Sequence, residues 1–246
     1  MESLLDKVCG QHNWKCFIIN LKRATKRREQ VSQFLKEIGL QSFEFFEAVD
    51  KIDLMKQGEQ TLKYNAKING NHEYGVTACK MSHENLYEHF LHTCKEEYLF
   101  VLEDDAGFVL DYSGFGKNPH FQNYRNLEIF MNELSQVPKH IWNSITFGLS
   151  YNVSFPFTDN ITLTRRTDLT HAMIFNRSAC HYMLGVIKDK RYYEMPVDHV
   201  MTVLRGNNTL VTLSPKETII DQVNIHESFI WEKVSINQES SNEEKQ

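Results

Sequence analysis

The stretch YLFVLEDDAGF at residues 98–108 decides the fold class. Its first five residues form a continuous apolar run with the length of a buried strand. The run ends abruptly in Glu103, Asp104 and Asp105. Ligands of open α/β sheets collect at the carboxyl ends of strands, and three clustered carboxylates need a cation or hydrogen-bond donors to offset their repulsion. The stretch therefore predicts an α/β fold with a ligand site at this acidic run.

Strand and helix patterns alternate on both sides of the acidic run. Apolar residues at Val31, Phe34, Leu35 and Ile38 have helical spacing, and Gly39 follows as a stop signal. A second helix is expected over 74–93, a third near 124–136, and a fourth over 178–187 with Ser178 as its cap. Strands are expected at 16–20, 43–49, 142–148, 171–175 and 209–213. Residues 50–72 predict a loop with a short helix near Leu54. This order predicts one mixed α/β sheet flanked by helices.

Composition and charge exclude several classes of protein. The chain has 246 residues and a formal net charge of -5, which gives no global reason to expect nucleic-acid binding. No stretch approaches the roughly 20 apolar residues of a transmembrane helix, and no apolar signal-peptide core is found at the N-terminus. The five cysteines form no CxxC pair. We therefore expect a cytoplasmic protein with reduced cysteines, and peripheral contact with a membrane stays compatible with the sequence.

The acidic run has a specific chemistry as well as bland alternatives. Mg²⁺ and Mn²⁺ take carboxylate oxygens and commonly share their remaining positions with a substrate phosphate. A cation held there would neutralise a diphosphate leaving group. Acidic residues after a strand can equally be solvated loop charges or helix caps, and phosphatases and nucleases also build on such residues. The run alone leaves these alternatives open.

Further motifs resemble glycosyltransferase family 25, which contains lipooligosaccharide glycosyltransferases and collagen β-galactosyltransferases. The resemblance covers roughly residues 16–230. It rests on IINLKRATKRRE (18–29), FEFFEAVD (43–50), YGVTACKMSHENLYE (74–88), YLFVLEDDAGFVLDY (98–112), THAMIFNRSACHYML (170–184) and MPVDHVM (195–201). It implies a GT-A-type fold, a nucleotide-sugar donor that is usually UDP-linked, a divalent cation, and transfer with inversion. Lys80 departs from the family pattern, which has a small or apolar residue there.

The resemblance also implies an organisation and a function for the chain. We expect an N-terminal extension at 1–14, a catalytic domain at 15–234 and a disordered polar tail at 235–246. The expected activity is metal-dependent, inverting transfer of galactose or glucose from a UDP-sugar to a hydroxyl on a glycan, a lipid-linked lipooligosaccharide or a protein. Mn²⁺ is the expected cation, with Mg²⁺ as the alternative. Two competing hypotheses are a catalytically degenerate nucleotide- or glycan-binding module and a metal-dependent phosphohydrolase.

Site residues follow from matching the family motifs position by position. The implied metal ligands are Glu103, Asp105 and His226, and the implied catalytic base is Asp198, which could instead cap the helix after Pro196. A base is needed because the acceptor hydroxyl loses a proton as it attacks the anomeric carbon. Binding of the nucleotide or the sugar is assigned to Asn20, Arg23, Arg27, Ser82, His83, Asp104, Thr170 and His171. For Arg27 the alternative is a solvated helix face, and for His83 it is a structural place in the core.

Overall fold

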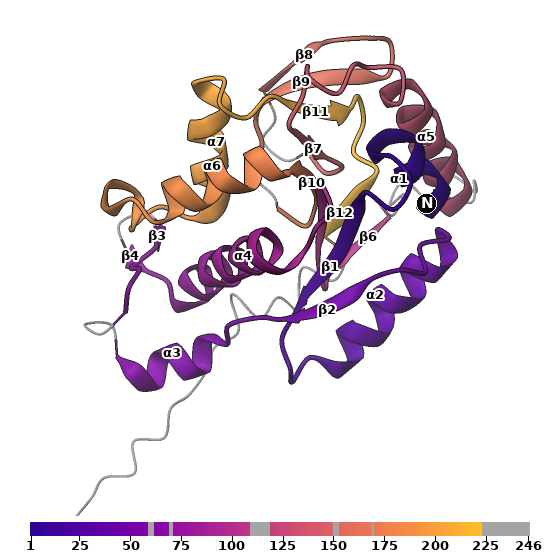
Figure 1. The fold of residues 1–246 in the computed structure, drawn as a ribbon. Coiled ribbons are helices and arrows are strands. Elements are labelled where there is room, and N and C mark those ends of the chain that lie inside the picture. Colours follow the sequence, from indigo (N-terminus) through magenta and orange to yellow (C-terminus); the bar gives the residue numbers. More distant parts are fainter. Residues whose placement is uncertain (59–61, 69–70, 109–118, 150–152, 169, 223–246) are drawn as a thin grey trace, which may run out of the picture.

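A sheet of eight strands forms the centre of the computed structural model (Figure 1), which describes residues 1–58, 62–68, 71–108, 119–149, 153–168 and 170–222. The strand order is β2-β1-β5-β10-β7-β11-β9-β8. The bounds are β1 Trp14–Asn20, β2 Glu44–Glu47, β5 Tyr98–Glu103, β7 Ser144–Thr146, β8 Val153–Pro156, β9 Ile161–Arg166, β10 Ala172–Asn176 and β11 Thr212–Pro215. Parallel and antiparallel pairs both occur, so the mixed α/β sheet expected from the sequence is confirmed.

Three parallel strands bring the acidic run to one edge of this sheet. β1 lies between β2 and β5 and runs parallel to both. Ile19 pairs with Glu103, and Asn20 pairs with Glu47, so the three strands end at the same level. Parallel strands joined through helices direct the loops after their carboxyl ends to one side of the sheet. Residues that follow β1, β2 and β5 therefore meet there.

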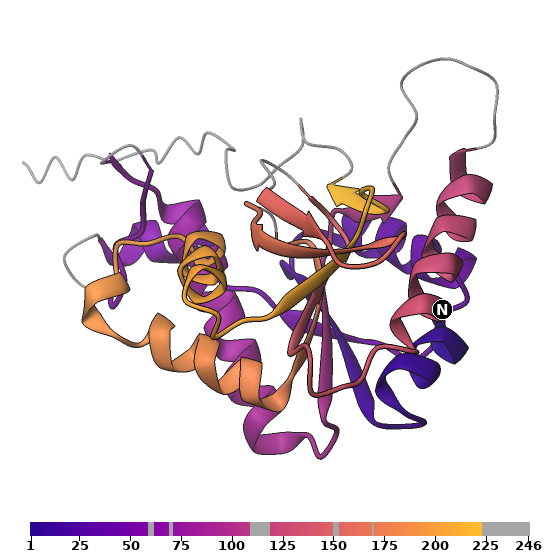
Figure 2. The ribbon, with the colours of Figure 1, turned by 90° about the horizontal axis from the view of Figure 1, so that it is seen from above.

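Helices cover both faces of the sheet because successive side chains of its strands point to opposite sides. Cys16 and Ile18 of β1 belong to a hydrophobic cluster with α1 Glu2–Cys9, α2 Thr25–Glu37 and α5 Pro119–Leu134. Phe17 and Ile19 belong to a second cluster with α4 Tyr74–Thr93, α6 Arg177–Ile187 and α7 Val197–Gly206. Figure 2 shows the resulting layers, with the sheet edge-on between the two sets of helices.

Two short antiparallel pairs lie outside the main sheet. β12 Ile220–Gln222 pairs with β6 Ala106–Phe108, so that Gln222 stands opposite Ala106, next to the acidic run. β3 Lys67–Ile68 pairs with β4 Asn71–His72 ahead of α4. The first of these pairs brings a segment from the end of the described chain to the turn after β5.

The local predictions from sequence hold with several differences. The helix expected near Leu54 is α3 Lys51–Gln57, capped by Asp50, whose carboxylate accepts a hydrogen bond from the Ile52 amide. Ser178 is not the cap of α6, because the Asn176 side chain accepts from the Ala179 amide and so caps the helix one residue earlier. Residues 1–14, set apart as an extension, contain α1, whose Leu5 and Val8 are buried in the same cluster as β1.

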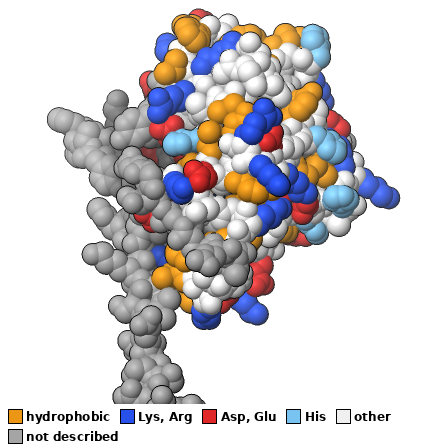
Figure 3. Space-filling view, turned by 90° about the vertical axis from the view of Figure 1, so that its left-hand side faces the viewer, with side chains coloured by type: hydrophobic (Ala, Val, Ile, Leu, Met, Phe, Trp, Pro, Cys, Tyr) orange, Lys and Arg blue, Asp and Glu red, His pale blue; other side chains and the backbone are white. Residues whose placement is uncertain are grey.

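The surface near α3 and the β3–β4 pair, on the left of Figure 1, mixes charges of both signs. Figure 3 shows Lys, Arg, Asp, Glu and His side chains interspersed with apolar ones on this side. A 3₁₀ helix at Lys190–Tyr192 (η2) leads from α6 towards α7. Within the described ranges, no helix has both the length and the apolar character needed to span a membrane.

Candidate functional site

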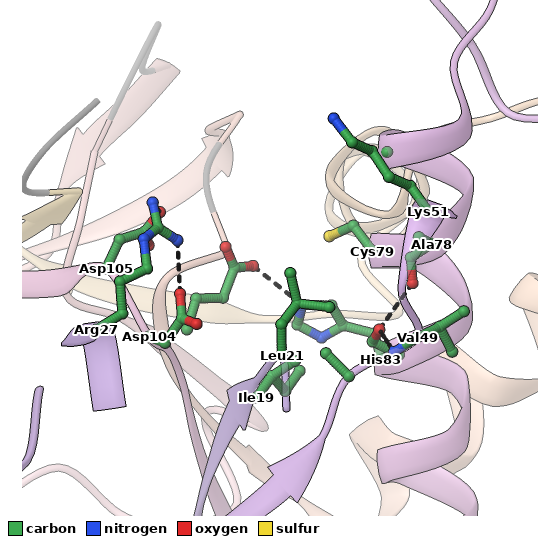
Figure 4. A pocket seen from close by; sticks show the side chains of 14 residues that line it. Ile19, Leu21, Arg27, Val49, Lys51, Ala78, Cys79, His83, Asp104 and Asp105 are labelled. Atoms are coloured by element: carbon green, nitrogen blue, oxygen red, sulfur yellow. Dashed lines mark hydrogen bonds and ion pairs between the residues drawn. The ribbon is translucent and has the colours of Figure 1, made fainter. Parts of the chain in front are cut away.

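A cavity with about 590 Å³ of empty space opens at the carboxyl ends of β1, β2 and β5. Its walls come from the ends of these strands, from α2, from the start of α3 and from one side of α4 (Figure 4). The residues that line it are Ile19, Leu21, Arg27, Ala48, Val49, Lys51, Gly75, Ala78, Cys79, Ser82, His83, Glu103, Asp104 and Asp105. The fold thus gathers five of the predicted site residues from three separated motifs, together with Ser82.

Arg27 lies between two of the carboxylates. Its Nη1 atom is 2.7 Å from Asp104 Oδ1, and its Nη2 atom is 3.5 Å from Asp105 Oδ2. The side chain of Arg27 is buried, which excludes the alternative of a solvated helix face. Asn20 donates to the second oxygen of Asp104 at 2.8 Å. Both oxygens of Asp104 are therefore engaged inside the protein, although burial still raises the pKa of this carboxyl.

Glu103 is held by two donors from opposite sides. His83 Nε2 lies 3.1 Å from Glu103 Oε1, and the Thr170 hydroxyl donates to the same oxygen in a short hydrogen bond. His83 Nδ1 lies 3.1 Å from the hydroxyl of buried Tyr87. Burial opposes ionisation of Glu103, but the contacts with His83 and Thr170 outweigh it and bring its pKa below the usual value. Glu103 is thus an ionised carboxylate at the cavity wall.

Asp105 differs from its neighbours because one of its oxygens is left over. Gln222 donates to Asp105 Oδ2 at 2.6 Å, across the β6–β12 pair. Asp105 Oδ1 is buried and has no hydrogen-bond partner among the described residues. Burial and the Glu103 carboxylate raise the pKa of Asp105 to about 7. A buried acceptor without a donor is costly, and a cation is the group that would satisfy it.

Three of the predicted binding residues have internal partners in the structure. Ser82 donates to the Ala78 carbonyl at 2.7 Å and accepts from the Val49 amide at 2.9 Å, which ties β2 to α4. His171 is buried, and its Nε2 atom lies 3.0 Å from the Ile220 carbonyl. Arg23 forms a partly exposed ion pair with Asp50, 2.6 Å away. Of these, only Ser82 lines the cavity.

Asp198 lies in the first turn of α7, on the border of this region. It does not cap the helix, and its Oδ1 atom accepts from the neighbouring His199 amide at 2.9 Å. Burial raises the pKa of Asp198. Burial also raises the pKa of Cys79, and the Glu103, Asp198 and Asp105 carboxylates raise it further. Asp198 therefore acts electrostatically on a residue of the cavity wall. His226, the remaining predicted ligand, falls outside the described residues.

Sequence reasoning missed three residues of the site. Lys51 is buried at the start of α3 and lines the cavity, and its signal was its position directly after the motif residue Asp50. Cys79 lies one helical turn before His83, a spacing that puts both side chains on one face of α4. Gln222 holds Asp105 through a contact that spans 117 positions of the chain, and no local pattern indicates it.

Comparisons with known proteins agree with this site. The chain is 31% identical over 156 residues to the Acanthamoeba polyphaga mimivirus protein named "Putative glycosyltransferase R655", a match that covers 62% of this chain and 41% of the relative. Among solved structures, a Drosophila β-1,4-galactosyltransferase 7 mutant in complex with manganese, UDP-Gal and xylobiose has a TM-score of 0.42 at 10% identity, covering 95% of this chain and 81% of that one.

A second solved structure is a glycosyltransferase involved in glycosylation of the major capsid of PBCV-1, with a TM-score of 0.38 at 9% identity, covering 77% of this chain and 74% of that one. The sequence model of glycosyltransferase family 25 (LPS biosynthesis protein) matches residues 13–201, which include every described residue of the cavity wall and Asp198. The chain belongs to glycosyltransferase family 25.

Proposed function

We propose that this glycosyltransferase moves a hexose, galactose or glucose, from a UDP-sugar to a hydroxyl group of a glycan, a lipid-linked lipooligosaccharide or a protein, with inversion at the anomeric carbon. The observation that carries the proposal is the buried Asp105 Oδ1 atom, which has no donor among the described residues and lies beside ionised Glu103. This pair of carboxylates fits Mn²⁺, with Mg²⁺ as the alternative, because both cations prefer oxygen ligands.

Glu103 and Asp105 would hold the cation, which would neutralise the charge that develops on the UDP leaving group. Two cationic side chains line the same cavity, Arg27 and Lys51. Arg27 is engaged with Asp104, so we assign contact with the diphosphate to Lys51 and orientation of the acidic turn to Arg27. Asn20 supports the same turn through Asp104.

Asp198 is the proposed base for the acceptor hydroxyl. Its pKa is raised by burial, which suits a group that must accept a proton near neutral pH. Its position at the start of α7 is separate from the acidic turn after β5. This separation lets the donor occupy one side of the cavity while the acceptor approaches from the other.

A panel of donors tests the proposal. UDP release would be measured with UDP-galactose, UDP-glucose and UDP-N-acetylhexosamines, with Mn²⁺, with Mg²⁺ or with EDTA, and with several hydroxyl acceptors. We expect one hexose donor to be strongly preferred and EDTA to abolish release. Asp198→Asn should lower kcat by roughly 10²–10⁴-fold, the usual contribution of a general base, with UDP affinity unchanged.

Asp53→Asn is the matched control, because Asp53 is an exposed acid on α3 that pairs only with Lys56 in a surface ion pair. It should leave release unchanged. UDP binding without any transfer, equally strong in EDTA and in Asp105→Ala, would favour the alternative of a degenerate binding module. Release of phosphate from simple phosphoesters would favour a phosphohydrolase.

A further inference from the structure

A second group of possible ligands lies on the same cavity wall, and it is distinct from the pair formed by Glu103 and Asp105. The group consists of Cys79, His83 and Glu103. One ligand atom from each, the Cys79 Sγ, a His83 ring nitrogen and a Glu103 oxygen, lies within 4.8 Å of the other two. Two of the residues are one turn apart on α4, and the third ends β5. Figure 4 shows Cys79 with its sulfur directed to the side of the cavity where the acidic turn lies.

The surroundings of this group already orient two of its members. The hydroxyl of Tyr87, a fully buried residue, lies 3.1 Å from His83 Nδ1 and leaves Nε2 turned towards Glu103. Thr170 donates to Glu103 from the opposite side. Metal-binding histidines nearly always use their other ring nitrogen in such a hydrogen bond, which fixes the tautomer and the ring. The structure therefore contains outer contacts of the kind that metal ligands have.

The ligand types differ from those that Mn²⁺ and Mg²⁺ favour. A sulfur, an imidazole nitrogen and a carboxylate oxygen together suit Zn²⁺ and similar cations, whereas Mg²⁺ and Mn²⁺ favour sites made of oxygen. Three protein ligands next to a cavity also leave a fourth position for water or another small ligand. The three side chains are at most partly exposed, and all three line the cavity.

We propose that Cys79, His83 and Glu103 form a zinc-type cation site on the cavity wall. Binding of the cation displaces the proton of the Cys79 thiol, which leaves to solvent, so that sulfur binds as thiolate. The site shares Glu103 with the cation pair of the proposed function. It follows, for the part that rests on that function, that Zn²⁺ competes with Mn²⁺-dependent transfer.

Cobalt provides a direct test, because Co²⁺ substitutes for Zn²⁺ and gives a thiolate-to-metal charge-transfer band in the near ultraviolet. The full chain, kept reduced, would be titrated with Co²⁺ and then with Zn²⁺. We expect one Co²⁺ to bind with this band and Zn²⁺ to remove it. Cys79→Ser should abolish the band and weaken binding about 100-fold or more, since even outer-shell changes cost roughly 10–100-fold.

Two controls isolate the site. Cys94→Ser changes a partly buried cysteine just beyond the C-terminal end of α4 and should keep the band. Asp105→Asn should also keep it, because Asp105 is not one of the three ligands. Tyr87→Phe should keep the band and weaken binding about 10-fold, as expected for a residue that only orients His83. Circular dichroism checks that each variant is folded, and Glu103→Gln replaces Cys79→Ser if the latter does not fold.

Absence of the band in the wild-type chain, or an identical band in Cys79→Ser, would overturn the proposal. The optical titration uses no nucleotide sugar, so its result is independent of the proposed transfer. If cobalt binds as expected and no donor is turned over, the zinc-type site stands and the proposed function fails. If transfer occurs and cobalt does not bind, the opposite holds.

Discussion

At the scale of single residues, the acidic run divides into three different roles. Asp104 is bound by Asn20 and Arg27, Glu103 by His83 and Thr170, and Asp105 keeps one oxygen without a donor among the described residues. Identical chemistry in adjacent positions is thus separated by which neighbours each side chain meets. The strand-end position of the run was predictable from YLFVL. The division of roles was not, because it depends on contacts with α2, α4 and β12.

The ionisation of Asp105 leads to the first prediction. Burial and Glu103 raise its pKa from 3.8 to about 7 in the folded protein. The folded state therefore binds this proton more tightly than the unfolded state does. Stability that Asp105 contributes at low pH should be lost as the pH rises from about 4 to about 7, with a slope of at most roughly 1.4 kcal/mol for each pH unit.

Urea unfolding of the metal-free protein in EDTA, compared with Asp105→Asn over the same pH range, measures this effect. The variant has no proton to bind at this position, so its stability should fall less steeply with pH. Other titrating groups contribute equally to both proteins and cancel in the difference. Two parallel stability curves would show that Asp105 has an ordinary pKa.

At the scale of elements, Lys80 connects α4 to the segment ahead of α7. The residue is completely buried. Its Nζ atom donates to the carbonyls of Tyr192, Tyr193 and Met195, at 2.9 Å in the last case, and lies 4.9 Å from the ring centre of Tyr64. Three carbonyls of one loop thus converge on one ammonium group. Asp198 follows this loop by a few residues, so Lys80 acts as a positioning residue for the proposed base.

Lys80→Met tests this connection. The variant leaves buried carbonyls without their donor, and each lost partner costs roughly 1–3 kcal/mol. We expect lower stability in urea and, in the donor assay, a fall in kcat with little change in the KM for the nucleotide sugar. Lys188→Met is the control, because Lys188 pairs with Glu88 at the surface, where such pairs are worth about 1 kcal/mol or less. Equal effects of the two substitutions would contradict the assignment.

Gly148 is the point where β7, the start of β10 and β12 approach most closely. A Cβ atom at this position would lie 2.1 Å from His171 Nε2 and 2.7 Å from the Ile220 carbonyl oxygen. A methyl group therefore forces His171 or β12 to move, and β12 carries the Gln222 that holds Asp105. We expect Gly148→Ala to destabilise the protein by about 1–3 kcal/mol, in the range of overpacking, and to weaken Mn²⁺ binding.

Gly185→Ala provides the comparison for this prediction. Gly185 is exposed on α6, and an added Cβ there meets no atom within 4 Å. Alanine in a helix is favoured over glycine by about 1 kcal/mol, so this variant should be slightly more stable than the wild type. Chemical denaturation of the two variants side by side decides the matter. A neutral Gly148→Ala would mean that the approach of the three strands is loose.

At the scale of the whole molecule, the sequence predicted the layered α/β fold but missed one end of its sheet. β1, β5 and β10 have the apolar runs of central strands, and their prediction holds. β9 and β8 were not predicted. The buried side of β9 is polar, since Thr162 and Thr164 share hydrogen bonds with Ser214 of β11. Apolar periodicity cannot detect a strand whose buried face consists of paired hydroxyl groups.

The last prediction concerns the stability of the whole chain in the presence of ligands. A ligand that binds only the folded state stabilises it by about 2.7 kcal/mol at a concentration 100 times its Kd. For a chain of this size, each kcal/mol corresponds to roughly 2–4 °C in Tm, so Mn²⁺ with UDP should raise the Tm by about 5–10 °C. The two ligands should act together, because the diphosphate of UDP completes the surroundings of the cation held by Glu103 and Asp105.

Thermal unfolding with Mn²⁺, UDP, both or neither measures this cooperation, with ADP as the control for the base. UDP alone in EDTA should give a small shift, and Asp105→Ala should lose the additional shift that Mn²⁺ provides. Asp53→Asn should behave as the wild type, since its carboxylate lies on the exposed side of α3. A UDP shift that is as large in EDTA and in Asp105→Ala as in the wild type with Mn²⁺ would separate nucleotide binding from the acidic run, because the nucleotide would then bind without a cation at Asp105.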